Sequence, residues 1–185
     1  MPRNRRLQDR EEKREEILAV AQRLFIDDGY ESTSMGRIAK HAGVTVNTIY
    51  WYFRDKDDLL IAVLDRLLTE ALAQYATIAD RPLNDRLLWA VDQLERLRGL
   101  VNTVHTRAPV SPAVHTWHTG FHALADGLIA DDLRKAGVAE ADLPAMIEIG
   151  TFVIEGLLTH QRDDADKRAV IDLLVRKLTT APTRT

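Results

Sequence analysis

The 185-residue chain contains no cysteine. Disulfide bonds, thiolate metal sites and cysteine nucleophiles are therefore excluded, and a reducing compartment such as the cytoplasm is expected. No apolar run approaches the roughly 18 consecutive residues that a membrane-spanning helix needs. The opening stretch, MPRNRRLQDREEKREE, also lacks the apolar segment of a secretory signal. We therefore expect an intracellular protein with no membrane partner.

Strand signals are nearly absent as well, because no stretch alternates apolar and polar residues between turn signals. Helical periodicity dominates instead. The first helix is expected to begin at Asp9, a suitable N-cap with Glu12 three residues later, and to stop at Gly29. The pattern predicts an all-α protein of about nine helices, the later ones near 34–41, 45–52, 56–72, 83–105, 113–135, 142–161 and 165–179.

Charge is distributed unevenly. The formal net charge is -3, which taken alone argues against a nucleic-acid binder. Residues 1–10, however, carry four arginines against Asp9 alone, and residues 34–56 carry four basic residues against Asp55 alone. A local basic surface on an acidic chain is typical of a compact DNA-reading module.

The two short helices near 34–41 and 45–52 have the features of a helix-turn-helix. Ala39 is small enough for the helices to approach closely, and Gly43 supplies the positive φ that a tight turn requires. The outer face of the second helix would then enter the major groove. That face contains no acidic residue and consists of Thr45, Val46, Asn47, Thr48, Tyr50 and Trp51.

A longer set of sequence words surrounds this corner: Ile17-Leu18-Ala19-Val20-Ala21, Leu24-Phe25, Gly29-Tyr30-Glu31-Ser32-Thr33-Ser34, Ile38-Ala39-Lys40-His41-Ala42-Gly43-Val44, Thr48-Ile49-Tyr50-Trp51-Tyr52-Phe53 and Lys56-Asp57-Asp58-Leu59-Leu60. With these words in register, residues 11–60 resemble the DNA-binding head of the TetR family of ligand-released repressors. Beyond residue 75 the resemblance is one of architecture only. We expect residues 1–53 to be the DNA-binding domain and residues 54–185 a regulatory, ligand-binding and dimerisation domain.

The resemblance implies roles for single residues. Thr33, Ser34, Tyr50 and Lys56 match phosphate ligands, and Thr45, Val46 and Asn47 match the positions that most often read bases. Gly36 departs from the pattern, because several members carry a long polar side chain there, so Arg37 beside it is expected to touch only the backbone. Arg3, Arg5 and Arg6 form either a solvated tail or an arm that enters the minor groove.

The last two predicted helices are apolar on more than one side. A C-terminal helix cannot be covered on all sides by its own chain, so a two-fold partner is the economical solution. We expect a homodimer interface formed by Phe152, Ile154, Leu158, Ile171 and Leu174.

Five of the six histidines lie in the predicted body, and His115, His118 and His122 share one helical stripe. Three imidazoles on one face are able to bind zinc or another late transition metal. No acidic residue stands among them, however, and the stripe spans two turns, which strains a single site, so no metal ligands are assigned. The alternatives are exposed or packing histidines, or an effector pocket with candidate residues Trp89, His105, Trp117, His118, Phe121 and His122.

Together with these patterns, the resemblance implies a homodimeric repressor that leaves a palindromic operator in double-stranded DNA when an unknown small-molecule effector binds. A metal-sensing regulator that uses the histidine stripe, a metal-dependent helical enzyme and a DNA-binding scaffold without an effector remain alternatives. No catalytic residue and no cofactor are expected, because no motif supplies a carboxylate base.

Overall fold

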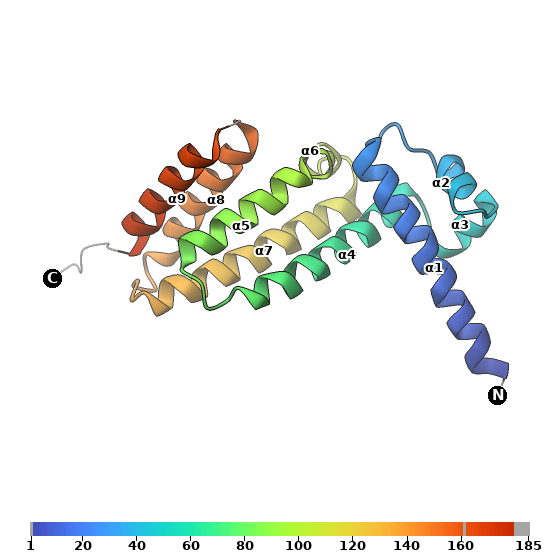
Figure 1. Ribbon diagram of the computed structural model, residues 1–185, viewed down its shortest axis with the longest axis horizontal. Coiled ribbons are helices and arrows are strands. Elements are labelled where there is room, and N and C mark those ends of the chain that lie inside the picture. The colour runs from blue at the N-terminus through green and yellow to red at the C-terminus, as the bar shows by residue number, and fades with distance from the viewer. Residues whose placement is uncertain (1, 161, 180–185) are drawn as a thin grey trace. The chain divides into compact units, whose positions relative to one another are not determined.

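The computed structural model describes residues 2–160 and 162–179, with side chains from residue 10 onward. This part of the chain contains nine helices and no strand, which confirms the predicted all-α class (Figure 1). The helices are α1 (Pro2–Asp27), α2 (Met35–His41), α3 (Val46–Tyr52), α4 (Lys56–Thr77), α5 (Leu83–Arg96), α6 (Arg98–Arg107), α7 (Pro112–Lys135), α8 (Leu143–Thr159) and α9 (Asp164–Thr179).

Helix α1 is longer than predicted. It begins at Pro2, so Asp9 lies within the helix and does not cap it. Proline is well tolerated in the first turn, where its missing N–H has no partner to lose. The residues that follow include arginine, leucine, glutamine and glutamate, which are good helix formers, and no glycine interrupts them before Gly29.

The single helix predicted at 83–105 is two helices in the structure. α5 ends at Arg96, and Leu97 leaves the helical region with φ -102° and ψ 18°. The Leu97 N–H turns back to the Leu94 carbonyl at 3.1 Å, which tightens the last turn. Gly99 follows directly and weakens helix propagation at this point. The apolar periodicity continues across the break, so the sequence pattern did not reveal it.

The chain divides into two compact units. The first contains the chain up to residue 72 together with residues 99–118. Its core is built from one face of α1, including Ile17, Ala21 and Phe25, against apolar residues of α2, α3 and α4, among them Ile38 and Ile49, all buried. The spacing of the α1 residues, one turn apart, explains why that face turns inward.

The second unit contains residues 73–98 and those from 119 onward. Here α5, α8 and α9 pack on one another around a core that includes Val91, Leu133 and Ile171. Buried polar groups are paired: the Lys167 Nζ lies 2.8 Å from a Glu95 carboxylate oxygen, and hydrogen bonding to Glu95 raises the lysine pKa. A buried lysine is tolerated because this partner keeps its charge compensated.

None of the nine helices combines the length and apolar character needed to cross a membrane, as judged over the described residues. The functional boundary expected between residues 53 and 54 stays a prediction.

Candidate nucleic-acid interface

Two short helices and a tight turn form the predicted reading corner. Ser34 precedes α2 and its hydroxyl accepts a hydrogen bond from the Arg37 N–H at 3.1 Å. Thr45 precedes α3 and accepts from the Thr48 N–H at 3.2 Å. Both are N-caps, which satisfy N–H groups that a helix start leaves without partners. Gly43 adopts φ +64°, the left-handed conformation expected for it between the two helices.

Helix α3 presents one face to the core and the opposite face outward. Ile49 is fully buried, whereas Val46, Tyr50 and Trp51 are 37%, 51% and 58% exposed. Asn47 is exposed beside them. An amide, a methyl-bearing side chain and two aromatic rings are therefore displayed on one non-acidic surface. Such groups are able to bond adenine edges, touch thymine methyls or reach phosphates.

Thr45, the N-cap of α3, and Thr48 within the helix have structural roles. The Thr45 and Thr48 hydroxyls lie 2.9 Å apart and share a hydrogen bond, while Thr45 also caps the helix. Their position at the helix start remains suited to DNA contact. Val46 and Asn47, next to them in the first turn, are both exposed.

Thr33 does not fit the phosphate role that the resemblance implies. Its side chain is fully buried, and its hydroxyl donates to the carbonyls of Gly29 at 2.9 Å and Leu24 at 3.3 Å. The hydroxyl therefore stabilises the turn between α1 and α2. Ser34, by contrast, is exposed at the start of α2.

Arg37 is held by an ion pair. Its Nη2 lies 2.8 Å from the Asp28 carboxylate, and both side chains are more than a third exposed. Asp28 therefore compensates the charge of Arg37 and ties its side chain to the end of α1 and the turn that follows. Pairs of this kind at a surface contribute little to stability.

Lys56 opens α4 and lies over the ring of Tyr30, with its Nζ 3.8 Å from the ring centre. Burial lowers the pKa of this lysine. The aromatic ring fixes the ammonium group at the N-terminus of a long helix, where phosphate is favoured by the helix dipole.

Sequence reasoning counted Arg10 only as part of a charge excess. In the structure its guanidinium carbon lies 4.2 Å from the centre of the Trp51 ring, so α1 supplies a cation to the outer face of α3. Arg14, one turn later, lies over Phe53 at 5.3 Å. The spacing of Arg10 and Arg14, one helical turn apart, was the sequence signal that both lie on the same face of α1. The backbone of Arg3, Arg5 and Arg6 belongs to α1, and their side chains lie outside the described residues.

A part-buried network of hydrogen bonds joins the helix-turn-helix to α6 within the first unit. Asp57, the second residue of α4, accepts hydrogen bonds from the Tyr30 hydroxyl and from Arg107 at the end of α6. Burial alone would raise the pKa of the Asp57 carboxyl, but the hydrogen bonds from Arg107, Tyr30 and Ser111 outweigh it and hold the pKa below its usual value. The same burial and the bond to Asp57 raise the pKa of the Tyr30 hydroxyl.

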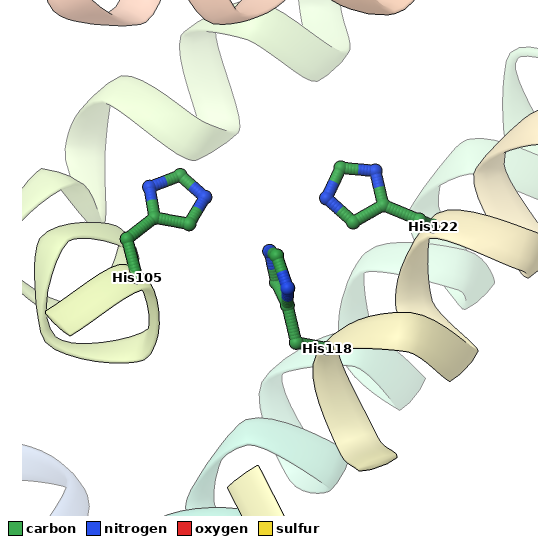
Figure 2. Close-up of side chains that lie close together, drawn as sticks. All are labelled: His105, His118 and His122. Carbon is green, nitrogen blue, oxygen red and sulfur yellow. The ribbon is translucent and has the colours of Figure 1, made fainter. Parts of the chain in front are cut away.

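The residues expected to line an effector pocket have different surroundings. The Trp117 indole N–H donates to Asp65 at 2.7 Å, and Trp89 packs on Tyr75 with ring centres 5.9 Å apart. The rings of His105 and His118 meet edge to face at 5.1 Å, which the sequence did not predict (Figure 2). Phe121 contacts the ring of its neighbour His122 at 5.8 Å. Their role in effector binding stays a prediction.

The predicted dimer residues divide into two groups. Ile171 and Leu174 belong to the core of the second unit, with Ile154 and Leu158 packed against that core, so burial inside the monomer already explains them. Phe152 is 63% exposed, as expected for an interface. The other large apolar side chains exposed on α8 and α9 are ones that sequence reasoning missed: Ile149, Val170 and Leu173. We call Ile149, Phe152, Val170 and Leu173 the α8–α9 face.

Residues 17–63 match the family model described as bacterial regulatory proteins of the tetR family. The HTH-type transcriptional regulator AcrR of Shigella flexneri is 58% identical over 52 residues, which are 28% of this chain and 24% of that protein. The regulator SAB2452 of Staphylococcus aureus strain RF122 is 41% identical over 69 residues, 37% of each. The match thus spans about a quarter to two fifths of the length of these relatives.

Solved structures extend the likeness in fold to most of the chain. A transcriptional regulator from Saccharomonospora viridis, solved in complex with choline, superposes with a TM-score of 0.72 at 23% identity and covers 92% of this chain and 97% of its own. A regulator from Rhodococcus gives a TM-score of 0.73 at 17% identity, covering 89% and 95%. The matched relatives are described as transcriptional regulators, in line with the expectation that the chain is not an enzyme.

Proposed function

We propose that the chain is a transcriptional regulator of the TetR family, whose model residues 17–63 match. It would act in the cytoplasm as a homodimeric repressor that leaves a two-fold operator when a small-molecule effector binds. The observation that carries the proposal is the outer face of α3. It is exposed, free of acidic side chains and carries Arg10 stacked on Trp51. Lys56 lies over the ring of Tyr30 at the start of α4, the next helix along the chain.

DNA recognition is assigned to two sets of groups. Val46 and Asn47, with Thr45 and Thr48 beside them, would read base edges in the major groove. Ser34, Tyr50 and Lys56 would hold phosphates and set the register of the corner on the duplex. Trp51 and Arg10 extend the second set, because a stacked indole and guanidinium present a flat cationic edge.

Dimerisation is assigned to the α8–α9 face. Four large apolar side chains are exposed to water on two adjacent helices of the second unit. Moving one such side chain from full exposure to full burial against a partner would stabilise the dimer by about 1.5–3 kcal/mol. A two-fold axis through this face would cover the same residues on both protomers. It would also provide two reading corners for half-sites one DNA turn apart, about 34 Å.

Release is assigned to a shift of α6. Arg107, the last residue of α6, forms an ion pair with Asp57 at the start of α4, next to Lys56. An effector that favours a different position of α6 would therefore move the phosphate-binding end of α4. The Saccharomonospora viridis regulator of similar fold was solved with choline, which supports a small organic effector for this chain as well.

The proposal is tested by selecting duplexes from a random library with the purified chain. We expect enrichment of one two-fold symmetric sequence, and a sedimentation mass for the complex of two chains per duplex. A screen of small molecules, choline included, should then find compounds that lower affinity for that sequence. Enrichment of an asymmetric site bound by one chain would contradict the dimeric repressor.

A further inference from the structure

Three histidines converge from two helices. Figure 2 shows the rings of His105 on α6 and of His118 and His122 on α7 pointing toward one another. One nitrogen from each ring lies within 4.8 Å of the corresponding nitrogens of the other two. The cluster therefore contains His105 from another helix and not His115, which the sequence stripe had suggested.

We propose that His105, His118 and His122 form a binding site for a divalent late transition metal ion, with zinc as the representative. His118 and His122 are one turn apart on the uninterrupted helix α7, a spacing at which two imidazoles share one metal. His105 and His118 belong to the same compact unit and already touch. Helix geometry and one packing contact thus bring all three ligands together.

The distances are compatible with coordination. Nitrogens bound to one tetrahedral zinc at about 2.0–2.1 Å lie roughly 3.3–3.4 Å apart. The observed separations, within 4.8 Å, close to that value by small rotations of the rings, whose second torsion is soft. His105 is exposed and the other two are half-buried, so an ion has access from solvent.

The donor set selects the class of metal. Three imidazoles suit zinc, copper, nickel and cobalt, whereas magnesium and calcium prefer oxygen ligands. His122 also has a carboxylate neighbour, with its Nε2 3.8 Å from Glu155 on α8. Sequence reasoning saw no acidic residue near the stripe. A carboxylate beside a ligating imidazole commonly holds the ring in place and strengthens its binding. Three protein ligands leave a fourth position for water or an anion.

The site goes beyond the proposed repressor function and does not depend on it. The test uses the full chain without a histidine tag, stripped with chelator and with no DNA present. Titration with Co²⁺, followed by its visible absorption, should show a tetrahedral signal that saturates at one ion per chain and is displaced by Zn²⁺. Zn²⁺ should also raise the melting temperature, because it binds the folded state.

His105→Ala and His118→Ala should each weaken Co²⁺ binding by at least about 100-fold and abolish the zinc-induced shift in melting temperature. His115→Ala is the matched control, since it removes an exposed histidine of α7 outside the cluster and should change neither measurement. Circular dichroism of each metal-free variant checks that it folds. A wild type that binds no Co²⁺ at micromolar concentration, or variants that bind it as well as the wild type, would overturn the site. DNA selection is read separately, so failure of the metal site leaves the repressor proposal untouched.

Discussion

Arg107 forms a bidentate ion pair with Asp57 through its guanidinium group. Its Nε lies 3.2 Å from one carboxylate oxygen and its Nη2 2.6 Å from the other, although the two residues are 50 positions apart in the chain. The pair joins the end of α6 to the first turn of α4 within one compact unit. Bidentate pairing fixes orientation as well as distance. It links α6 directly to the helix that carries Lys56.

Replacing Asp57 by Asn should lower the free energy of unfolding at neutral pH by about 1–3 kcal/mol, because Arg107 and Tyr30 lose a charged partner in a part-buried place. The pKa of Asp57 is lowered in the folded state, so its contribution is present above the unfolded pKa of about 3.9 and is lost as pH falls through the folded pKa. The stability difference between wild type and variant should therefore shrink below about pH 4. Urea unfolding at several pH values measures it.

The control for Asp57 is Glu70→Gln, which breaks an exposed pair with Arg66 one turn away on α4. Exposed pairs of this kind contribute about 0.3–0.5 kcal/mol. A loss at Asp57 no larger than the loss at Glu70 would show that the Asp57 pair does not stabilise the first unit.

Lys56→Ala should weaken binding about equally on the selected operator and on random DNA, because the contact is with phosphate. The slope of log affinity against log salt should fall by roughly one unit. Fluorescence anisotropy over a salt series measures both. Lys135→Ala removes an exposed lysine of the second unit and should leave the slope unchanged. A changed operator preference in the Lys56 variant would argue for base contact.

Asn47→Ala and Val46→Ala should change which bases are preferred. Each is expected to cost roughly 1–3 kcal/mol on the best site and little on random DNA. Repeating the duplex selection with each variant shows which operator positions relax. A uniform loss on all sequences would move base reading to other residues of α3.

Phe152→Glu and Leu173→Glu should produce folded monomers, because both side chains lie on the exposed α8–α9 face. Operator affinity should fall with dimerisation although the reading corner is unchanged. Ile171→Glu is different: it buries a charge in the core and should unfold the second unit. Sedimentation and thermal melts separate these outcomes. If Phe152→Glu and Leu173→Glu both remain dimers, the α8–α9 face is not the interface.

Gly36→Ala should stabilise the protein by about 0.4–1 kcal/mol. Gly36 lies in α2 with no positive φ, and an added Cβ would meet Ser34 at 3.8 Å and Val46 at 4.0 Å, which are ordinary contacts. Gly43→Ala serves as the contrast, because its φ of +64° strains any side chain, and that variant should be less stable than wild type. Thermal melts of both variants give the signs.

The sequence by itself determined the features that depend on neighbouring residues. The turn at Gly43 and the outward face of α3 follow from backbone sterics and helical periodicity, and the structure has both. Most helix boundaries followed in the same way. The start of α1 and the break at Leu97 did not, because terminal and mid-helix interruptions depend on small free-energy differences that residue patterns do not resolve.

Only the tertiary structure decided which partner each ambiguous side chain takes. A threonine hydroxyl is able to donate a hydrogen bond either to a phosphate or to a backbone carbonyl. Packing buries Thr33, and its hydroxyl donates to the Gly29 carbonyl. Periodicity marked two apolar faces on the last helices, but only their packing placed Ile171 inside and Leu173 outside. The meeting of His105 with His118 depends on α6 lying beside α7. Such choices rest on contacts between residues distant in sequence, and local patterns carry no information about them.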